Sequence, residues 1–268
     1  MDLDKILHHT IQVAKEAGAY IRKEREDFDW SKVEQKKTFS DLVSYVDKEA
    51  EKRIVEKLHH LIPGAGFITE EGMVDYKSDK YNWVIDPLDG TTNFLHGLPV
   101  YSTSIALMKE KEEILGVVYE INQDECFYAR KNGGAFCNNK RIRVSKAKTL
   151  NESLIATGFP YASFDRMPNY LKIITHLMAN THGIRRLGSA AVDLVYVAAG
   201  RLEGFFEFGL NPWDMAGGTI ILKEAGGVVT DFEGNDDYIF GNAGMISGCA
   251  IHSDLLKVIN ELWNTPLE

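Results

Sequence analysis

The 268-residue sequence predicts a fold of mixed class, α+β in an N-terminal lobe (residues 1–145) and α/β in a C-terminal lobe (residues 146–268). Two amphipathic helical patterns stand near the start, and short apolar strands separated by turn residues follow them. Beyond a polar stretch at residues 145–151, apolar strand patterns alternate with helical ones. Helices beside an antiparallel sheet are typical of the first class, and alternation of strands and helices is typical of the second.

The first predicted elements are two amphipathic helices. From residue 4 to about residue 25, apolar residues recur at helical spacing with polar residues between them. A second helix is expected to begin within Phe39–Ser44, because Ser44 and Asp47 are spaced as in a capping box. Its apolar stripe continues to Leu61, where a proline and two glycines follow and end the helix.

Short apolar runs predict the strands, and helical patterns come between the later ones. In the N-terminal lobe we expect strands at residues 67–68, 83–85, 102–108, 114–119 and 125–129. In the C-terminal lobe the alternating elements are expected at residues 154–157, 168–178, 184–187, 189–199, 202–208, 213–225, 227–230, 246–250 and 253–263.

Composition restricts the class of protein. Hydrophobic residues make up 44% and charged residues 26%, as in an ordinary globular protein, and the net charge of −9 argues against nucleic acid as a partner. Five basic residues between Lys140 and Lys148 form a local cluster, for which a solvated face is the default interpretation. No leader segment and no apolar run of about 20 residues is present, so we expect a cytoplasmic protein without a membrane partner. Three cysteines without CxxC spacing indicate neither disulfides nor a thiolate metal site.

The stretch from Asp86 to Phe94, DPLDGTTNF, carries the strongest chemical signal. Two carboxylates three residues apart follow an apolar strand, and the proline between them stiffens the turn and leaves the Leu88 carbonyl free. Gly90 allows a ligand to approach the backbone, and the two threonines add hydroxyls. Hard oxygen ligands beside an anion cradle suggest a divalent metal and a phosphate. The same residues also make a good turn, so this stretch alone leaves both interpretations open.

Other carboxylates stand at element boundaries. Glu70 follows a short strand, and Asp214 opens a predicted helix whose small residues 216–218 allow close packing against another element. With Asp86 and Asp89 they could supply an oxygen-only site for two Mg²⁺ ions, although Asp214 would also serve as a helix cap. Residues 185–191, RRLGSAA, combine a strand end, a glycine and a helix start, which suits either an anion or a simple cap.

Other catalytic templates are absent. There is no GxxxxGK[ST], GxSxG or HExxH motif, and the eight histidines have no ligand spacing.

These motifs resemble those of the inositol monophosphatase family, in particular its bacterial inositol-1-monophosphatase branch. The likeness covers essentially the whole chain and rests on residues 41–47, 67–71, 86–94, 185–194 and 213–218 in the expected order. The resemblance implies a layered αβαβα sandwich, Mg²⁺-dependent hydrolysis of phosphomonoesters by an activated water without a covalent intermediate, and inhibition by Li⁺. It also implies a homodimer. Gly72 departs from the pattern, since many relatives carry serine there.

The resemblance also implies roles for individual residues. About two or three Mg²⁺ ions per subunit are expected, and their ligands would be Glu70, Asp86, the Leu88 carbonyl, Asp89 and Asp214. Asp47 and Thr91 would orient and activate the attacking water, with help from Glu70. The remaining contacts would go to the substrate: phosphate to the amides of Gly90 and Thr91, and the polyol to Arg185, Gly188, Ser189, Ala190, Glu207, Asp89 and Asp214.

Two alternatives stay open at this point. The substrate could be another small phosphomonoester, such as fructose 1,6-bisphosphate, histidinol phosphate or adenosine 3′,5′-bisphosphate, because polyol contacts vary among members of the family. A regulatory binding role with the transcription machinery is the second alternative, with Arg185, Arg186 and the basic segment 140–148 as contacts. The complete set of acidic residues argues against a role without catalysis.

Overall fold

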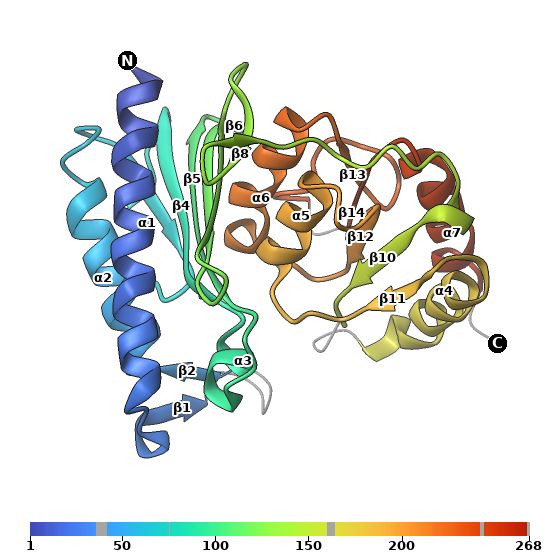
Figure 1. Cartoon of the computed structure of the whole chain (residues 1–268), viewed down its shortest axis with the longest axis horizontal. Coiled ribbons are helices and arrows are strands. Elements are labelled where there is room, and N and C mark those ends of the chain that lie inside the picture. Colours follow the sequence, from blue (N-terminus) through green and yellow to red (C-terminus); the bar gives the residue numbers. More distant parts are fainter. Residues whose placement is uncertain (36–41, 75, 160–163, 242–243, 267–268) are drawn as a thin grey trace.

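The computed structural model describes residues 1–35, 42–74, 76–159, 164–241 and 244–266. Its elements stack in five layers, helix, sheet, helix, sheet and helix, from the N-terminal side to the C-terminal side (Figure 1). The layered αβαβα arrangement expected from the resemblance is confirmed.

Two helices cover the outer face of the first sheet. Helix α1 (Leu3–Glu26) begins at Asp2, whose side chain accepts from the Lys5 amide, and packs on α2 and on the middle of the sheet. Helix α2 (Tyr45–Leu58) is capped by Ser44 in the predicted capping box, in which the side chain of Asp47 accepts from the Ser44 amide. Both helices bury an apolar stripe against the sheet.

The first sheet has seven strands in the order β3-β4-β5-β6-β7-β8-β9. Only the β3–β4 pair is parallel, and the other pairs are antiparallel. The strands are β3 (Gly66–Thr69), β4 (Tyr81–Asp89), β5 (Ser102–Lys109), β6 (Glu112–Glu120), β7 (Glu125–Arg130), β8 (Gly134–Cys137) and β9 (Lys140–Arg141). A short hairpin of β1 (Val33–Gln35) and β2 (Leu42–Ser44) lies beside α3 (Thr91–His96) (Figure 1).

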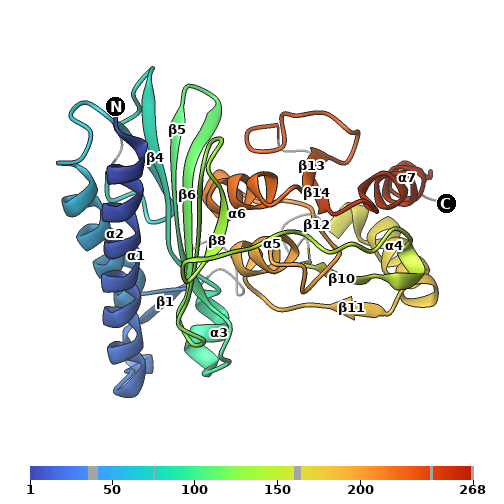
Figure 2. The same ribbon diagram turned by 45° about the horizontal axis from the view of Figure 1, so that its top comes forward.

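The middle layer contains α5 (Ala190–Ala198) and α6 (Pro212–Glu224), which lie side by side between the two sheets (Figure 2). Helix α6 presses closely on the first sheet, because a Cβ at Gly116 in β6 would lie 2.5 Å from the Gly217 carbonyl oxygen. A Cβ at Gly217 would in turn meet the Ser104 hydroxyl at 2.5 Å. The close packing predicted from the small residues of this helix is therefore confirmed.

The second sheet has five strands in the order β11-β10-β12-β14-β13, with its first three strands parallel. They are β10 (Leu154–Thr157), β11 (Gly183–Arg185), β12 (Gly204–Glu207), β13 (Val228–Asp231) and β14 (Met245–Gly248). Its outer face is covered by α4 (Met167–Asn180) and α7 (His252–Trp263). Short 3-10 turns occupy Trp30–Lys32, Leu150–Glu152 and Phe164–Arg166.

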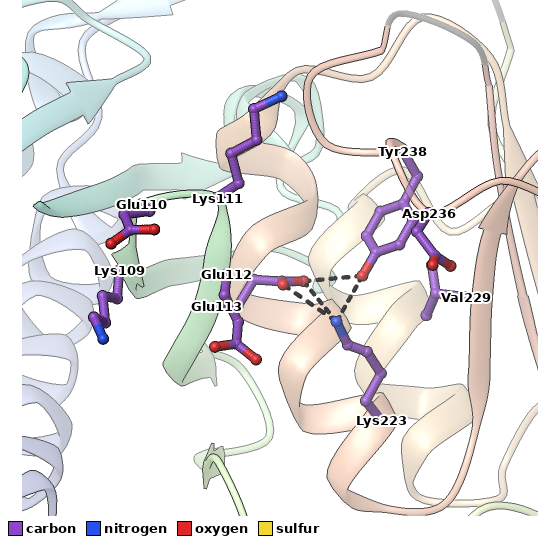
Figure 3. A pocket seen from close by; sticks show the side chains of 9 residues that line it. All are labelled: Lys109, Glu110, Lys111, Glu112, Glu113, Lys223, Val229, Asp236 and Tyr238. Carbon is purple, nitrogen blue, oxygen red and sulfur yellow. Dashed lines mark hydrogen bonds and ion pairs between the residues drawn. The ribbon is translucent and has the colours of Figure 1, made fainter. Parts of the chain in front are cut away.

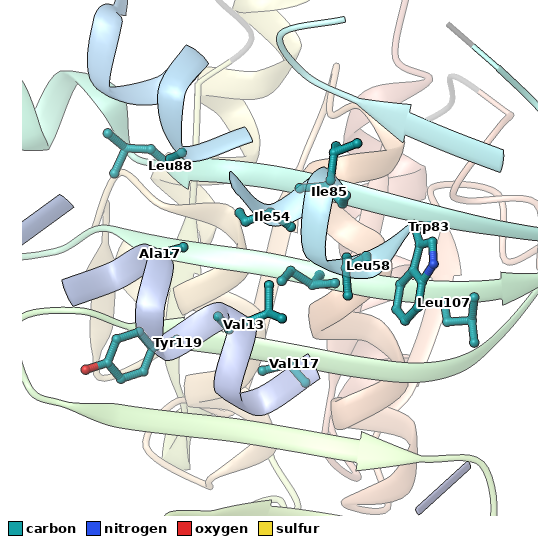
Figure 4. Close-up of a cluster of buried hydrophobic side chains, with 14 of the residues drawn as sticks. Val13, Ala17, Ile54, Leu58, Trp83, Ile85, Leu88, Leu107, Val117 and Tyr119 are labelled. Carbon is teal, nitrogen blue, oxygen red and sulfur yellow. The ribbon is translucent and has the colours of Figure 1, made fainter. Parts of the chain in front are cut away.

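Three apolar clusters fill the spaces between the layers. The first lies between α1, α2 and the first sheet, where Ile54, Leu58 and Trp83 are fully buried (Figure 4). The second surrounds α5 and α6, and the third joins the second sheet to α4 and α7. Burial on this scale makes apolar contact the main stabilising interaction between the layers.

Several predicted boundaries differ from the structure. The second helix begins at Tyr45, and residues 42–44 form strand β2, while residues 36–41 lie outside the described residues. Strand β9 and helix α3 were not predicted because each is short and rich in polar residues, and β8 was not predicted because it is only four residues long and begins with glycine. No helix among the described residues is long and apolar enough to cross a membrane. The division into lobes at residue 145 stays a prediction.

Candidate functional site

The candidate site forms where β4 ends, and this end differs from the predicted turn. The strand continues through Pro87 to Asp89, and its pairing with β5 shifts register between Asp86 and Asp89. Proline has no amide hydrogen to donate, so the irregularity falls at a residue that cannot continue the ladder. Gly90 then adopts a φ of +94°, a left-handed conformation that favours glycine, and α3 begins at the next residue.

Asp47 and Thr91 are brought together although 44 residues separate them. The Thr91 hydroxyl lies 2.9 Å from Asp47 Oδ1 and 3.0 Å from the Leu88 carbonyl oxygen. Asp47 Oδ2 accepts from the amide and hydroxyl of Ser44, at 2.8 and 2.6 Å. Burial raises the pKa of Asp47, and the hydrogen bonds from Ser44 and Thr91 oppose this effect. The cap of α2 and the Thr91 hydroxyl therefore share one carboxylate.

Asp86 lies at the centre of a group of acids. Its side chain is 2% exposed, and Oδ1 accepts from the Leu88 amide at 2.9 Å. Burial raises the pKa of Asp86, and the negative charges of Glu70, Asp89 and Asp214 raise it further. The structure thus brings together the four acids that the sequence suggested as metal ligands.

Asp89 ties the end of β4 to the start of α5. Its Oδ2 accepts from the Ser189 hydroxyl at 2.6 Å and from the Ala191 amide at 2.7 Å. Burial raises the pKa of Asp89, while these hydrogen bonds and the positive charge of Arg186 lower it. The residue therefore anchors the helix and also presents charge to the site.

Asp214 reaches the same region from the start of α6. It stands in the first turn, where Oδ2 accepts from the Asn211 amide at 2.6 Å in a second capping box. Burial is the largest cause of its raised pKa, and the charge of Asp89 adds to this effect. Asp214 can therefore cap α6 and still belong to the candidate site, the two roles that the sequence left open for it.

The donor set suits a hard divalent cation. Every side-chain donor in the group is a carboxylate oxygen. Burial raises the pKa of Asp86 and Asp214, the charges of neighbouring acids raise it further, and a bound cation would oppose both effects. Within the described part of the chain, however, no three His, Cys, Asp or Glu side chains already converge as a metal-binding group. One oxygen each of Asp86, Asp89 and Asp214 already accepts a backbone hydrogen bond. The chemistry of the donors fits, and the coordination geometry stays a prediction.

Glu207 and Gly158 form the side of the site that faces the second sheet. A Cβ at Gly158 would lie only 1.9 Å from the Glu207 carboxylate, so any larger residue would displace that acid. Burial raises the pKa of Glu207 to about 8, against the opposing charge of Arg186. Among the other predicted substrate contacts, Gly188 has a φ of +92° and its carbonyl oxygen lies near Gly90.

The two neighbouring arginines are both exposed, but they act on different groups. Arg185 is exposed, and its guanidinium donates to the Ile184 carbonyl oxygen at 3.0 Å. The charge of Arg186 lowers the pKa of Asp89 and Glu207. Strand β11 ends at Arg185, so Arg186 lies in the loop before α5, and no local pattern distinguishes the two arginines.

Asp193 was missed as a member of this region. It is 1% exposed, and its Oδ1 has no hydrogen-bond partner among the residues the structure describes. Burial raises its pKa well above the usual range, and the charges of Glu207 and Asp89 add to this. Its place four residues after Ser189, on the same helix face, was the available signal.

A second polar cluster lies at the other end of α6, beside a cavity of about 530 Å³ (Figure 3). Glu113, 6% exposed, accepts from the Thr219 hydroxyl at 2.9 Å and from the Tyr238 hydroxyl at 3.1 Å. The Lys223 ammonium lies 3.2 Å from the same carboxylate. Here the buried acid already has its counter-charge.

Comparison with known proteins gives consistent results. The model of the inositol monophosphatase family matches residues 2–265. An inositol-1-monophosphatase of Mesorhizobium japonicum is 38% identical over 96% of each chain. A fructose-1,6-bisphosphatase/inositol-1-monophosphatase of Thermotoga maritima is 43% identical, over 86% of this chain and 87% of its own.

Other similar proteins carry a different name. The Nus factor SuhB of Vibrio cholerae is 41% identical, over 87% of this chain and 88% of its own. The crystal structure of extragenic suppressor protein suhB from Bartonella henselae superposes with a TM-score of 0.89 at 39% identity, covering 96% of this chain and 99% of that one. The fold is therefore shared by proteins named as enzymes and by proteins named for other effects.

Proposed function

Because the chain belongs to the inositol monophosphatase family, we propose that it hydrolyses inositol 1-phosphate to inositol and phosphate in a Mg²⁺-dependent reaction. The family supports phosphatase activity on small phosphate esters, and the particular ester is our proposal. The observation that carries it is the group of Glu70, Asp86, Asp89 and Asp214 at the end of β4, beside the Asp47–Thr91 hydrogen bond.

We propose that Glu70, Asp86, Asp89, Asp214 and the Leu88 carbonyl hold about two or three Mg²⁺ ions. When bound, Mg²⁺ neutralises phosphate charge and makes a water molecule more acidic. Thr91 would position this water, because its hydroxyl lies between Asp47 and the Leu88 carbonyl. Asp47 would draw the Thr91 proton toward itself and so leave the hydroxyl oxygen free to accept from the water, and Glu70 would assist.

The leaving group would lie between the two halves of the chain. The amides of Gly90 and Thr91 would donate to phosphate oxygens. The polyol hydroxyls would meet Ser189, Glu207 and the neighbouring Gly188 and Ala190, with Asp89 and Asp214 nearby. The contacts support Arg186 more strongly than Arg185 as the arginine of this group, because the charge of Arg186 acts on Asp89 and Glu207.

A substrate panel tests the proposal. Phosphate release would be measured with inositol 1-phosphate, fructose 1,6-bisphosphate, histidinol phosphate and adenosine 3′,5′-bisphosphate, each with Mg²⁺, with EDTA, and with Mg²⁺ plus Li⁺. We expect the highest kcat/KM with inositol 1-phosphate, no release in EDTA, and inhibition by Li⁺. A preference of about a hundredfold for another ester, some 2.7 kcal/mol, would overturn the assignment of the substrate. Equal release in EDTA would overturn the proposed chemistry.

We also propose a cytoplasmic homodimer and, as a second candidate function, binding to the transcription machinery. The specific observation is the segment 140–148, in which Lys140, Arg141, Arg143, Lys146 and Lys148 are all exposed. A similar protein named Nus factor SuhB makes this worth testing. Pull-down from a cell extract should retain a transcription protein on the wild type and on Asp86→Asn, and lose it when Arg143 and Lys146 become glutamate. Equal capture by all three would contradict this role for the segment.

A further inference from the structure

Glu51 is a buried carboxylate to which the motifs assign no role. It lies in α2, one helical turn after Asp47, and is 0% exposed. Its Oε1 accepts from the Thr69 hydroxyl at 2.9 Å and from the Met73 amide at 2.8 Å. Its Oε2 accepts from the Glu71 amide at 2.8 Å. Three donors from one segment thus converge on a single side chain.

The segment that Glu51 holds contains Glu70. Thr69 and Glu71, the residues on either side of it, are both hydrogen-bonded to the Glu51 carboxylate. The Glu70 amide also donates to the Ile85 carbonyl oxygen in β4, at 3.2 Å. With the backbone fixed on both sides, the Glu70 side chain is held toward Asp86, whose pKa its charge raises.

The chemistry of this contact is specific to a carboxylate. All three partners donate hydrogen bonds, and a carboxylate can accept all of them because both of its oxygens are acceptors. No lysine or arginine is paired with Glu51 within the described residues, so these hydrogen bonds must compensate for its burial. An apolar residue here would leave the amides of Glu71 and Met73 without this acceptor.

Helix α2 therefore carries two buried acids, at positions i and i+4 on one face. Asp47 reaches the Thr91 hydroxyl at the start of α3, and Glu51 reaches the segment after β3. We propose that Glu51 is a positioning residue that fixes Glu70 for binding Mg²⁺ and so sets the affinity of the site for that ion. This inference rests on the proposed function in one respect only, that Glu70 is a Mg²⁺ ligand.

The test compares Glu51→Gln with Glu56→Gln, in which an exposed glutamate of the same helix is changed. In Glu51→Gln an amide NH₂ would face a backbone N–H, so one hydrogen bond is replaced by repulsion. Thr69→Val is a milder variant that removes only the hydroxyl bond and keeps the shape of the side chain. Each metal-free protein is titrated with Mg²⁺ by calorimetry, and thermal unfolding is recorded in EDTA.

We expect Glu51→Gln to bind Mg²⁺ about tenfold or more weakly than Glu56→Gln, as is usual when a partner of a metal ligand is lost. Thr69→Val should weaken binding about threefold. At saturating Mg²⁺, KM for the phosphomonoester should stay within about twofold, because Glu51 does not reach the substrate side. If Glu51→Gln unfolds, Thr69→Val alone decides the question.

Unchanged Mg²⁺ affinity in both variants, with only a lower Tm, would make Glu51 a purely structural residue and overturn the inference. The binding measurement needs no substrate, so it stays informative if no ester is hydrolysed. Absence of phosphate release by the wild type would therefore contradict the proposed function, whereas normal Mg²⁺ binding by the variants would contradict the role of Glu51.

Discussion

Two groups of buried acids lie at opposite ends of α6, and they differ in what balances their charge. At its C-terminal end, Glu113 is paired with Lys223 and accepts from Thr219 and Tyr238. At its N-terminal end, Asp86 and Asp214 are buried near further acids. Burial raises the pKa of both, and the charges of these neighbours raise it further. The first group has its counter-charge from the protein itself, and we propose that a bound cation balances the charge of the second.

The difference separates a structural role from a functional one. A buried acid that has its counter-charge and its hydrogen bonds holds elements together, here β6, α6 and the segment before β14. Like charges held together are unfavourable unless something else compensates for them, and such arrangements cluster at functional sites. Substitutions in the two groups should therefore have opposite effects on stability and activity.

The largest expected effect is on activity, in Asp86→Asn. The change should lower kcat for phosphate release about a hundredfold or more, because it removes a proposed metal ligand. The metal-free protein should be no less stable, since asparagine keeps an acceptor for the Leu88 amide and removes one of the repelling charges. Phosphate release and thermal unfolding in EDTA measure the two effects. Activity within about tenfold of the wild type would contradict the assignment.

The opposite result is expected for Lys223→Met. Loss of the ammonium leaves Glu113 buried without its counter-charge, which should lower stability by about 1–3 kcal/mol, less than for a fully buried pair because Lys223 is 41% exposed. At saturating Mg²⁺, kcat should stay within about twofold. Lys111→Met, at an exposed lysine beside the same cavity, is the control for loss of a positive charge. A stability equal to that of the control would show that the pair contributes nothing.

A smaller effect is expected on the pH dependence of stability, from a buried base that has no counter-charge among the described residues to favour its protonated form. His252 is 5% exposed, and burial lowers its pKa below 6.5. His252 therefore binds a proton at a higher pH in the unfolded chain than in the folded one. The stability that neutral His252 contributes is fully present above pH 6.5 and is lost as the pH drops toward its folded pKa. Between about pH 7.5 and about pH 5.5, His252→Gln should lose less stability than His176→Gln, an exposed control. Denaturant unfolding at the two pH values gives the comparison, and equal losses would contradict it.

Local sequence patterns identified the acids that we propose as metal ligands, but they did not identify the Glu113–Lys223 pair. Asp86, Asp89 and Asp214 stand in motifs whose residue types already suggest oxygen ligation, and local patterns placed them at element boundaries. The Glu113–Lys223 pair joins residues 110 positions apart, and no local pattern relates them. Long-range pairs of this kind depend on how the layers stack, which periodicity does not determine.

Glu51 shows where a signal existed and was missed. Its spacing from Ile54 and Leu58 places an acid on the buried stripe of α2, where a charge needs an explanation. Strand β4 shows the reverse case, in which the proline predicted a turn, but the strand continued past it with a shift in register. In both cases the outcome depended on contacts with residues distant in the sequence: the segment after β3 for Glu51, and strand β5 for β4.

The most direct test of the account is the effect of Mg²⁺ on thermal unfolding of the wild type, Asp86→Asn and Lys223→Met. At about 100 times its Kd, Mg²⁺ should stabilise the wild type and Lys223→Met equally, by about 2.7 kcal/mol per site. Asp86→Asn should show little or no shift, because the group that a cation completes has lost its central acid. Equal shifts in all three proteins would contradict the claim that Mg²⁺ completes the acids at the end of β4.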